Sequence, residues 1–237
     1  MKTSAQFRVA SLLSLALGIS VSLQGLASAE IEVPRGTLEV DRDLVRIGTR
    51  SNLDWNIEYP SVIDEIVDVD PPDEGTITPK QDVKMKVRVL GVAFQSGSTL
   101  LPVAAYWSLD KGSWSNFFYG DGNDVVASKV LINKQVSKGQ TIDFGSKGYT
   151  GRTWYPFYST VSNDQHVAVL KNGSSAPSYA PAYSQTSAAA ILRPYIDASG
   201  KISIGERDLI VLFENYTASP GSAYFDMQDI VILVTFE

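Results

Sequence analysis

Apolar and polar residues alternate most strictly over residues 82–89. Val83, Met85, Val87 and Val89 are apolar, and a charged residue precedes each of them. A period of two predicts a strand with one buried face. The same pattern recurs in shorter runs at Leu44–Ile47, Leu53–Tyr59, Leu101–Trp107, Val125–Ile132, Val136–Phe144 and His166–Leu170.

Two further runs are almost continuously apolar. They are Leu209–Phe213 and Ile230–Phe236, in which no polar residue recurs at every second position. Strands of this kind are covered on both faces. We therefore expect both runs at the centre of a layered core.

Glycine and asparagine mark three tight turns, where reversal of the chain requires positive φ. The turns are Asp110-Lys111-Gly112, Lys171-Asn172-Gly173 and Ser199-Gly200-Lys201. The third is expected to join Ile191–Asp197 and Lys201–Ile204 as a hairpin.

Helical signals are few. Ser61 begins either a short helix through Val67 or an extended segment, and Ala188–Leu192 is long enough for one helical turn. Gly173–Ser187 is rich in Ser, Ala, Pro and Tyr and is expected to be a surface loop. Many short strands with turns between them predict an all-β fold, an antiparallel β-sandwich with jelly-roll or immunoglobulin-like strand order left open.

The N-terminus has the three parts of a secretory signal peptide. Lys2 and Arg8 are basic, Val9–Leu26 is largely apolar, and Ala27-Ser28-Ala29 offers small residues for cleavage. The alternative is a membrane anchor, but glycine and serine interrupt a run that needs about 20 apolar residues to span a bilayer. We expect residues 1–29 to be a signal peptide and residues 30–237 to be a single β-sandwich domain.

Charge and cysteine content narrow the partners and the place of action. The chain has 20 basic and 26 acidic residues, so loss of Lys2 and Arg8 leaves 18 against 26, a net charge of −8. An acidic surface disfavours nucleic acid and anionic lipid. The chain has no cysteine, which excludes a lipoprotein and means that an apolar core must supply the stability. These features favour a secreted or cell-surface protein, and the lack of disulfides favours a bacterial one.

Signatures of catalysis are missing from the sequence. A Ser-His-Asp device would have to use His166, the single histidine, and no nucleophile elbow of the form G-x-S-x-G accompanies it. Without cysteine, one histidine also makes a zinc site improbable. A secreted hydrolase with paired carboxylates is an alternative, but no spacing rule nominates the pair. We expect a protein that is not an enzyme.

Two acidic loops carry oxygen ligands of the kind that calcium prefers. Asp121, Asn123 and Asp124 lie in Gly120–Val125, which resembles one unit of the glycine-rich calcium nonapeptide repeat, although that family stacks several copies. In the other loop, Asp68–Gly75, two prolines interrupt the spacing. The cofactor prediction is either none or calcium at Asp121, Asn123 and Asp124, with solvated turns as the alternative.

Aromatic residues are concentrated in two segments, 106–119 and 154–158. Sugars stack their apolar C–H faces on flat rings, so exposed rings on a sheet make a platform for glycans. The alternative is that the rings fill the core. The candidate glycan-binding residues are Trp107, Trp114, Trp154 and Tyr155.

Assembly through strand edges is the third possibility. The processed chain begins with the extended segment Glu30–Val33 and ends in an apolar strand with Phe236 penultimate, which resembles the logic of donor-strand pilins, although the pilin disulfide and glycine placement are missing. We expect a non-enzymatic structural or adhesive protein of the cell surface or matrix, whose partners are copies of itself or surface glycans. A carbohydrate-binding module is the alternative.

Overall fold

The computed structural model describes residues 35–40, 53–58, 61–69, 75–162, 165–176, 188–217, 219, 222 and 224–237. They are mostly strands in antiparallel sheets with very few helices, so the all-β prediction is confirmed. The described residues all belong to one compact unit, Glu32–Glu237. The expected signal peptide and the expected strand at Leu44–Ile47 lie outside the described residues, as does most of the Gly173–Ser187 loop.

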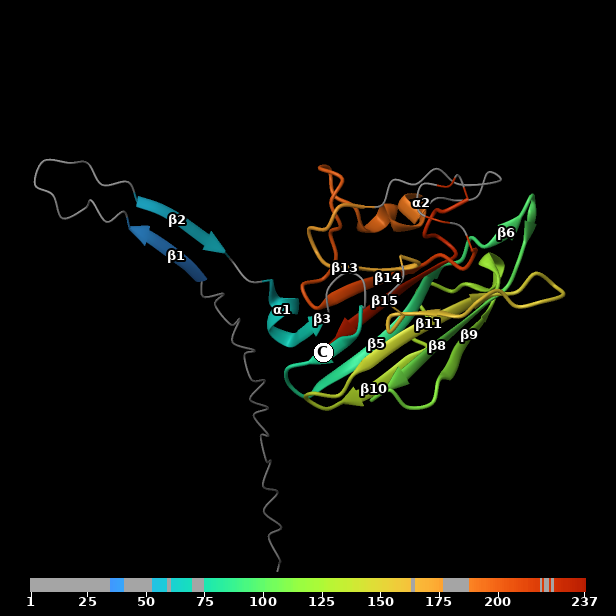
Figure 1. The fold of residues 1–237 in the computed structure, drawn as a ribbon, viewed down its shortest axis with the longest axis horizontal. Coiled ribbons are helices and arrows are strands. Elements are labelled where there is room, and N and C mark those ends of the chain that lie inside the picture. The colour runs from blue at the N-terminus through green and yellow to red at the C-terminus, as the bar shows by residue number, and fades with distance from the viewer. Residues whose placement is uncertain are drawn as a thin grey trace, which may run out of the picture. The chain divides into compact units, whose positions relative to one another are not determined.

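Five strands form the first sheet, in the order β10–β5–β15–β14–β13, and every neighbouring pair is antiparallel. Val87 in the middle of β5 lies opposite Ile132 of β10 on one side and Val234 of β15 on the other. Figure 1 shows the C-terminal strand, in red, within this sheet. The strands are Ile132–Val136, Val83–Gly91, Ile230–Phe236, Asp208–Phe213 and Val167–Leu170, respectively.

The second sheet has the order β3–β4–β11–β8–β9, and the short strand β12 also pairs with β11. Strands β8, β11 and β9 make its largest part. Between Ala105 and Tyr106 of β8 the register skips Phe117 of β9, which marks a β-bulge in β9. The strands are Val67–Val69, Ile77–Pro79, Ile142–Gly148, Val103–Leu109, Ser115–Gly120 and, for β12, Tyr158–Ser159.

A single buried cluster draws apolar residues from both sheets. From the first sheet it takes the alternate residues Val87, Val211 and Ile232, and from the second it takes Val103 and Phe144. The opposite face of the first sheet is also buried, because a second cluster forms there. Its members include Leu192, Ile202, Ile210, Leu212, Phe225, Met227, Val231 and Leu233.

Strands β14 and β15 are therefore buried on both faces, as their continuous apolar runs predicted. Leu209–Phe213 and Ile230–Val234 are all buried. The helix α2, Ala188–Leu192, lies over the face that carries the second cluster (Figure 1). The predicted helical turn at Ala188–Leu192 is confirmed, and β5 and β13 confirm the predicted strands at 82–89 and His166–Leu170.

Helices in the described part of the chain are short. Ser61 precedes α1, Val62–Ile66, and its Oγ donates a hydrogen bond to Oδ2 of Asp64 at 2.7 Å. The segment after Ser61 is thus a helix up to Ile66 and a strand from Val67. Since α1 and α2 have five residues each, neither reaches the length needed to cross a bilayer.

Two of the predicted strands are placed wrongly. Val125–Ile132 is a loop apart from its last residue, and β10 ends where Val136–Phe144 was expected to begin. The second error arises because a turn lies inside an apolar pattern: Gly139 has φ +80° and Gln140 N–H donates to the Ser137 carbonyl at 3.2 Å. The alternation continues through the turn although the strand does not.

The three turns are present, with one change and one failed hairpin. Asp110 and Lys111, with φ 53° and 56°, supply the positive φ between β8 and β9 in place of the expected Gly112. This is a primed turn in which glycine occupies the last position. The hairpin expected at 191–204 is reduced to one bridge, between Ile196 and Ile202, because α2 and the 3₁₀ helix η4, Arg193–Tyr195, occupy its first half.

Two smaller hairpins complete the described strands. β6, Gln95–Ser96, pairs with β7, Thr99–Leu100. Near the N-terminus, β1, Arg35–Val40, pairs with β2, Leu53–Glu58, in register from Arg35↔Glu58 to Val40↔Leu53. Among the described strands, β1 and β2 form a sheet of their own.

Candidate functional site

The two sides of the second sheet differ in what they carry. Ala105 of β8 is buried in the shared core, and Trp107 packs against that core. Tyr106 lies between them in sequence, and side chains alternate along a strand, so it points to the opposite side. Lys147 of β11 and Tyr119 of β9 both pair with Ala104 of β8, so they lie on the same side of the sheet as Tyr106.

Aromatic rings gather on this outer side and contact one another. Phe157 meets Trp114 at 5.0 Å and Tyr106 at 5.6 Å between ring centroids, both close to perpendicular. Trp154 meets Tyr149 at 4.8 Å and Tyr119 at 6.1 Å. We call these six rings, together with Lys147, the aromatic face. Its members are Tyr106, Trp114, Tyr119, Lys147, Tyr149, Trp154 and Phe157.

Four of the rings are substantially exposed to solvent. The exposed fractions are 37% for Trp114, 57% for Tyr119, 41% for Trp154 and 39% for Phe157. A soluble domain rarely leaves so many large rings together at its surface without a use for them. The aromatic face is therefore the strongest candidate for a ligand-binding surface in the described part of the chain.

Gly145 makes room for the ring at the centre of the face. A Cβ built at Gly145 would stand 2.2 Å from Cζ of Phe157, closer than any real contact. Gly145 pairs with Tyr106 across the β11–β8 ladder. Phe157 thus lies directly on the backbone of β11 and bridges Tyr106 and Trp114.

Lys147 links the two groups of rings. Its Nζ lies 4.5 Å from the centroid of Trp154 and 5.5 Å from that of Tyr106. An ammonium group over a ring is attracted by the negative face of the π system. A single cation therefore lies near both Trp154 and Tyr106 and adds positive charge to the aromatic face.

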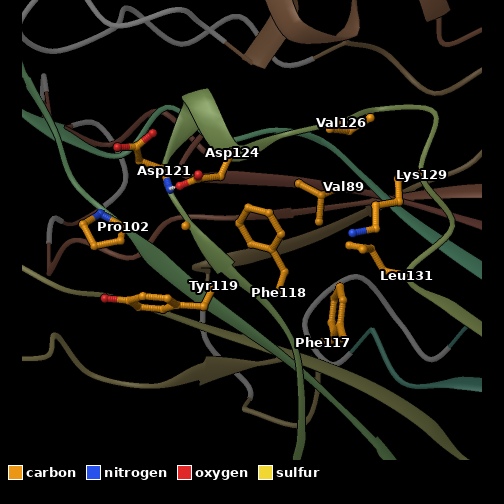
Figure 2. A pocket seen from close by; sticks show the side chains of 11 residues that line it. Val89, Pro102, Phe117, Phe118, Tyr119, Asp121, Asp124, Val126, Lys129 and Leu131 are labelled. Atoms are coloured by element: carbon orange, nitrogen blue, oxygen red, sulfur yellow. Dashed lines mark hydrogen bonds between the residues drawn. The ribbon is translucent and has the colours of Figure 1, made fainter.

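A pocket of about 630 Å³ adjoins the aromatic face at the β9 edge. Tyr119 belongs to both, since it also lines the pocket. Figure 2 shows Phe118 near the middle of the lining, with Asp121 on one side of it and Lys129 on the other. The remaining lining residues are mostly apolar and include Val89, Pro102, Phe117, Val126 and Leu131.

The residues nominated for glycan binding separate into two groups. Trp114 and Trp154 lie on the aromatic face, whereas Trp107 and Tyr155 are half-buried and pack against the shared core. Tyr155 also contacts Phe94 at 5.6 Å. Neighbouring side chains of an extended segment point to opposite sides. Trp107 and Tyr155 therefore point away from the aromatic face, although each is next in sequence to one of its members, Tyr106 and Trp154.

Sequence reasoning missed Lys147 and Tyr149. The alternation of this run predicts that Lys147 points to the side opposite Phe144. The sequence does not reveal that the run pairs with β8, which brings Lys147 next to Tyr106. Tyr149 joins the face through a single bridge to Trp154. Both positions depend on strand pairing between distant segments.

The predicted calcium ligands have local hydrogen-bonding roles. Asp121 caps the 3₁₀ helix η2, Gly122–Asp124, because its Oδ1 accepts from Asn123 N–H at 2.7 Å. In return, Asp124 Oδ2 accepts from Asp121 N–H at 3.0 Å. Within the described ranges, no group of three or more His, Cys, Asp or Glu side chains is arranged to hold a metal ion.

Calcium at this loop remains a prediction with a direct test. A rise in melting temperature at millimolar calcium that is lost in Asp124→Asn would support it, and no rise would remove it. Of the other loop, Asp68 lies in an ion pair with Lys80 at 2.7 Å, and residues 70–74 lie outside the described residues.

Buried acids occur at the junction of β14 and β15. Glu214, Asp226 and Asp229 are at most 3% exposed. Glu214 Oε2 accepts from Asp226 N–H at 2.8 Å, and Asp229 Oδ2 accepts from Asn215 N–H at 2.5 Å. Burial, and then the nearby charges of Glu214 and Asp226, raise the pKa of Asp229 well above its ordinary value.

These acids bear on the hydrolase alternative. Paired carboxyl groups with a raised pKa can act as acid and base on a glycosidic bond, but they must reach the substrate. Glu214 and Asp229 are enclosed and hydrogen-bonded to the backbone of their own loop. His166, the other catalytic option, stacks on Tyr158 at 4.0 Å and meets Phe225 at 5.7 Å, so aromatic rings contact its imidazole.

The chain matches no known protein family, and no curated protein or solved structure shows significant similarity to it. Its function must therefore be inferred from its own residues.

Proposed function

We propose that the protein is an exported, non-enzymatic adhesive protein that binds carbohydrate through the aromatic face. The observation that carries this proposal is the set of contacting, exposed rings on the outer side of β8, β9 and β11. The predicted signal peptide at residues 1–29 brings the domain to the cell surface or matrix, where polysaccharides are abundant.

The architecture that we propose for the domain is a β-sandwich. Support comes from the single buried cluster, to which both sheets contribute. In a sandwich, the outer side of the β8–β9–β11 sheet is a broad surface backed by rigid strands. A rigid backing keeps the rings in place before the ligand arrives, which lowers the entropy cost of binding.

Ring geometry favours sugars over other ligands. The near-perpendicular packing of Trp114 and Tyr106 against Phe157 fixes the ring planes and leaves part of each ring exposed. Pyranose rings offer flat apolar faces that stack on such surfaces, while their hydroxyl groups stay in water. The net charge of −8 for the processed chain disfavours nucleic acid, which also stacks on rings.

The test measures binding of the processed chain to insoluble and soluble polysaccharides. We expect Trp114→Ala and Phe157→Ala to weaken binding by roughly tenfold each, since stacked aromatic contacts contribute about 1 kcal/mol beyond the area they bury. Tryptophan fluorescence should change on binding, and Trp154→Phe should reduce that change.

Tyr224→Ala is the matched control, because Tyr224 is 48% exposed and lies in the β14–β15 connection rather than on the aromatic face. It should bind like the natural chain. Failure to bind any polysaccharide in a broad panel would refute the proposal, and equal losses in Tyr224→Ala and Phe157→Ala would refute the assigned surface.

Self-assembly is a second candidate, and the N-terminal hairpin favours it. A two-stranded hairpin is marginally stable alone in water. β1 and β2 pair only with each other among the described strands, so each retains an edge to which another chain can add. The C-terminal strand is not a comparable donor, because β15 already pairs with β5 and β14.

A further inference from the structure

The aromatic face carries a positive charge that stacking of neutral sugar does not require. Lys147 is half-buried, and the interactions of its Nζ are with the rings of Trp154 and Tyr106. Within the described part of the chain it makes no ion pair, unlike Lys80, Lys86 and Lys171, which all have carboxylate partners.

A second cation lies in the turn that carries Trp154. Arg152 is exposed, and among the described residues its one hydrogen bond is from its backbone N–H to Oγ1 of Thr150 at 3.3 Å. Asp143 is the acidic residue of the same strand as Lys147, but it is fully buried and accepts hydrogen bonds from Thr76 and Thr160. In the described structure Asp143 therefore makes no ion pair with Lys147 or Arg152.

We infer that the ligand is an acidic polysaccharide with one carboxylate per sugar, that is, a polyuronate, and that Lys147 binds the carboxylate. This inference rests on the proposed carbohydrate function and specifies its ligand. Trp114, Tyr119 and Phe157 are partly exposed and can offer ring surface for stacking, while the ammonium lies over the ring of Trp154.

Charge complementarity selects a singly charged sugar over a polysulfated one. The processed chain has a net charge of −8, so a dense polyanion is repelled by the molecule as a whole. A polyuronate carries one charge per sugar, so the overall repulsion is weaker than for a polysulfated chain, and each carboxylate can meet one or two local cations. A carboxylate contact with an ammonium group is also a charge-assisted hydrogen bond, which is stronger than a neutral one.

Polygalacturonate and its fully methyl-esterified form are the matched probes, because they share a backbone and differ in charge. We expect the processed chain to bind the acid form about tenfold more tightly than the ester at low salt, and added salt to weaken only the acid form. Dextran sulfate against dextran tests the sulfated alternative, and no preference for the sulfate is expected.

Lys147→Met removes the charge and keeps an unbranched side chain to lie on the rings. It should weaken binding of the acid form about tenfold and weaken binding of the ester by a clearly smaller factor, while Lys147→Arg retains the preference for the acid form. Lys134→Met is the control, since Lys134 is an exposed lysine of β10 in the other sheet. It should change neither affinity.

The outcomes separate this inference from the function on which it rests. Equal binding of acid and ester by the natural chain, equal losses for both probes in Lys147→Met, or a preference for the sulfate would overturn the polyuronate assignment and leave carbohydrate binding intact. Failure to bind polygalacturonate, its methyl ester, dextran, dextran sulfate or any other polysaccharide overturns both the polyuronate assignment and the proposed carbohydrate binding.

Discussion

The acid pair at Glu214 and Asp229 shows how burial changes the chemistry of a single residue. Asp229 is almost completely buried, and a side-chain hydrogen bond with Glu214 raises its pKa further. Two carboxyl groups that are buried together and hydrogen-bonded share a proton more easily than they bear two charges. Folding therefore favours the protonated form of Asp229 over its charged form.

The raised pKa of Asp229 predicts lower stability at high pH. A group with a raised pKa in the folded state contributes stability that is fully present below its ordinary value of 3.8 and is lost as pH rises through the folded value. Asp229→Asn keeps the shape, accepts from Asn215 N–H and donates to Glu214. We expect the free energy of unfolding of the variant, measured in urea at pH 5 and pH 9, to increase relative to that of the natural chain as pH rises.

Glu206→Gln is the control for this experiment, because Glu206 is exposed and no hydrogen bond or ion pair involves its side chain in the described structure. Its unfolding free energy should follow that of the natural chain at both pH values. If Asp229→Asn and the natural chain gave parallel pH profiles, the buried acid would not be protonated in the folded state.

Gly145 tests whether the position of one ring decides binding. Gly145→Ala places a Cβ where the Phe157 ring lies, at 2.2 Å from Cζ, so the ring must leave. We expect this variant to weaken polysaccharide binding roughly as much as Phe157→Ala does. Binding of the double variant should match that of Phe157→Ala alone, because both changes act through the same ring. Additive losses would show that Gly145→Ala acts elsewhere.

Strand β15 is the element on which the core depends most. Ile232 lies in its middle, fully buried in the shared cluster, and pairs with Val211 of β14. We expect Ile232→Ala to lower the free energy of unfolding by about 2–5 kcal/mol. Val126→Ala is the comparison, since Val126 is 58% exposed, and it should change stability by less than about 0.5 kcal/mol. Similar losses in the two variants would contradict this core.

Periodicity predicted some elements well and failed on others for identifiable reasons. The pattern of β5 matches its alternating burial, and the continuous runs of β14 and β15 match their two covered faces. β9 was missed because a register irregularity disturbs its pairing with β8, so that Phe117 and Phe118 both pack against the core. Two adjacent apolar residues on one side do not give a period of two.

Across the whole molecule, the site was predictable only in part. Trp114 and Trp154 were nominated because aromatic residues are dense near them in sequence, and both lie on the aromatic face. Their contacts with Phe157, Lys147 and Tyr149 result from pairing of β8, β9 and β11, which sequence patterns do not specify. Local sequence thus predicts which residues are candidates for the site, while strand pairing between distant segments decides which of them lie together.

An adhesive protein with one binding face per chain gains strength by presenting several faces at once. Linked sites convert later binding events into intramolecular ones, so retention can exceed single-site affinity by about 10²–10⁴ without new contacts. The N-terminal hairpin of β1 and β2 is our proposed link between copies, because neither strand pairs with any other strand in the described part of the chain.

Deletion of residues 30–58 from the processed chain removes this hairpin and leaves the aromatic face, which lies between Tyr106 and Phe157. We expect the natural chain to form concentration-dependent polymers in sedimentation experiments and the deletion variant to stay monomeric. Affinity for a short soluble oligosaccharide should be unchanged, because each face is intact, while retention on a polysaccharide-coated surface should fall by at least about tenfold.

A natural chain that stays monomeric at high concentration would exclude assembly through the hairpin, whereas a loss of oligosaccharide affinity on deletion would place part of the binding surface within residues 30–58.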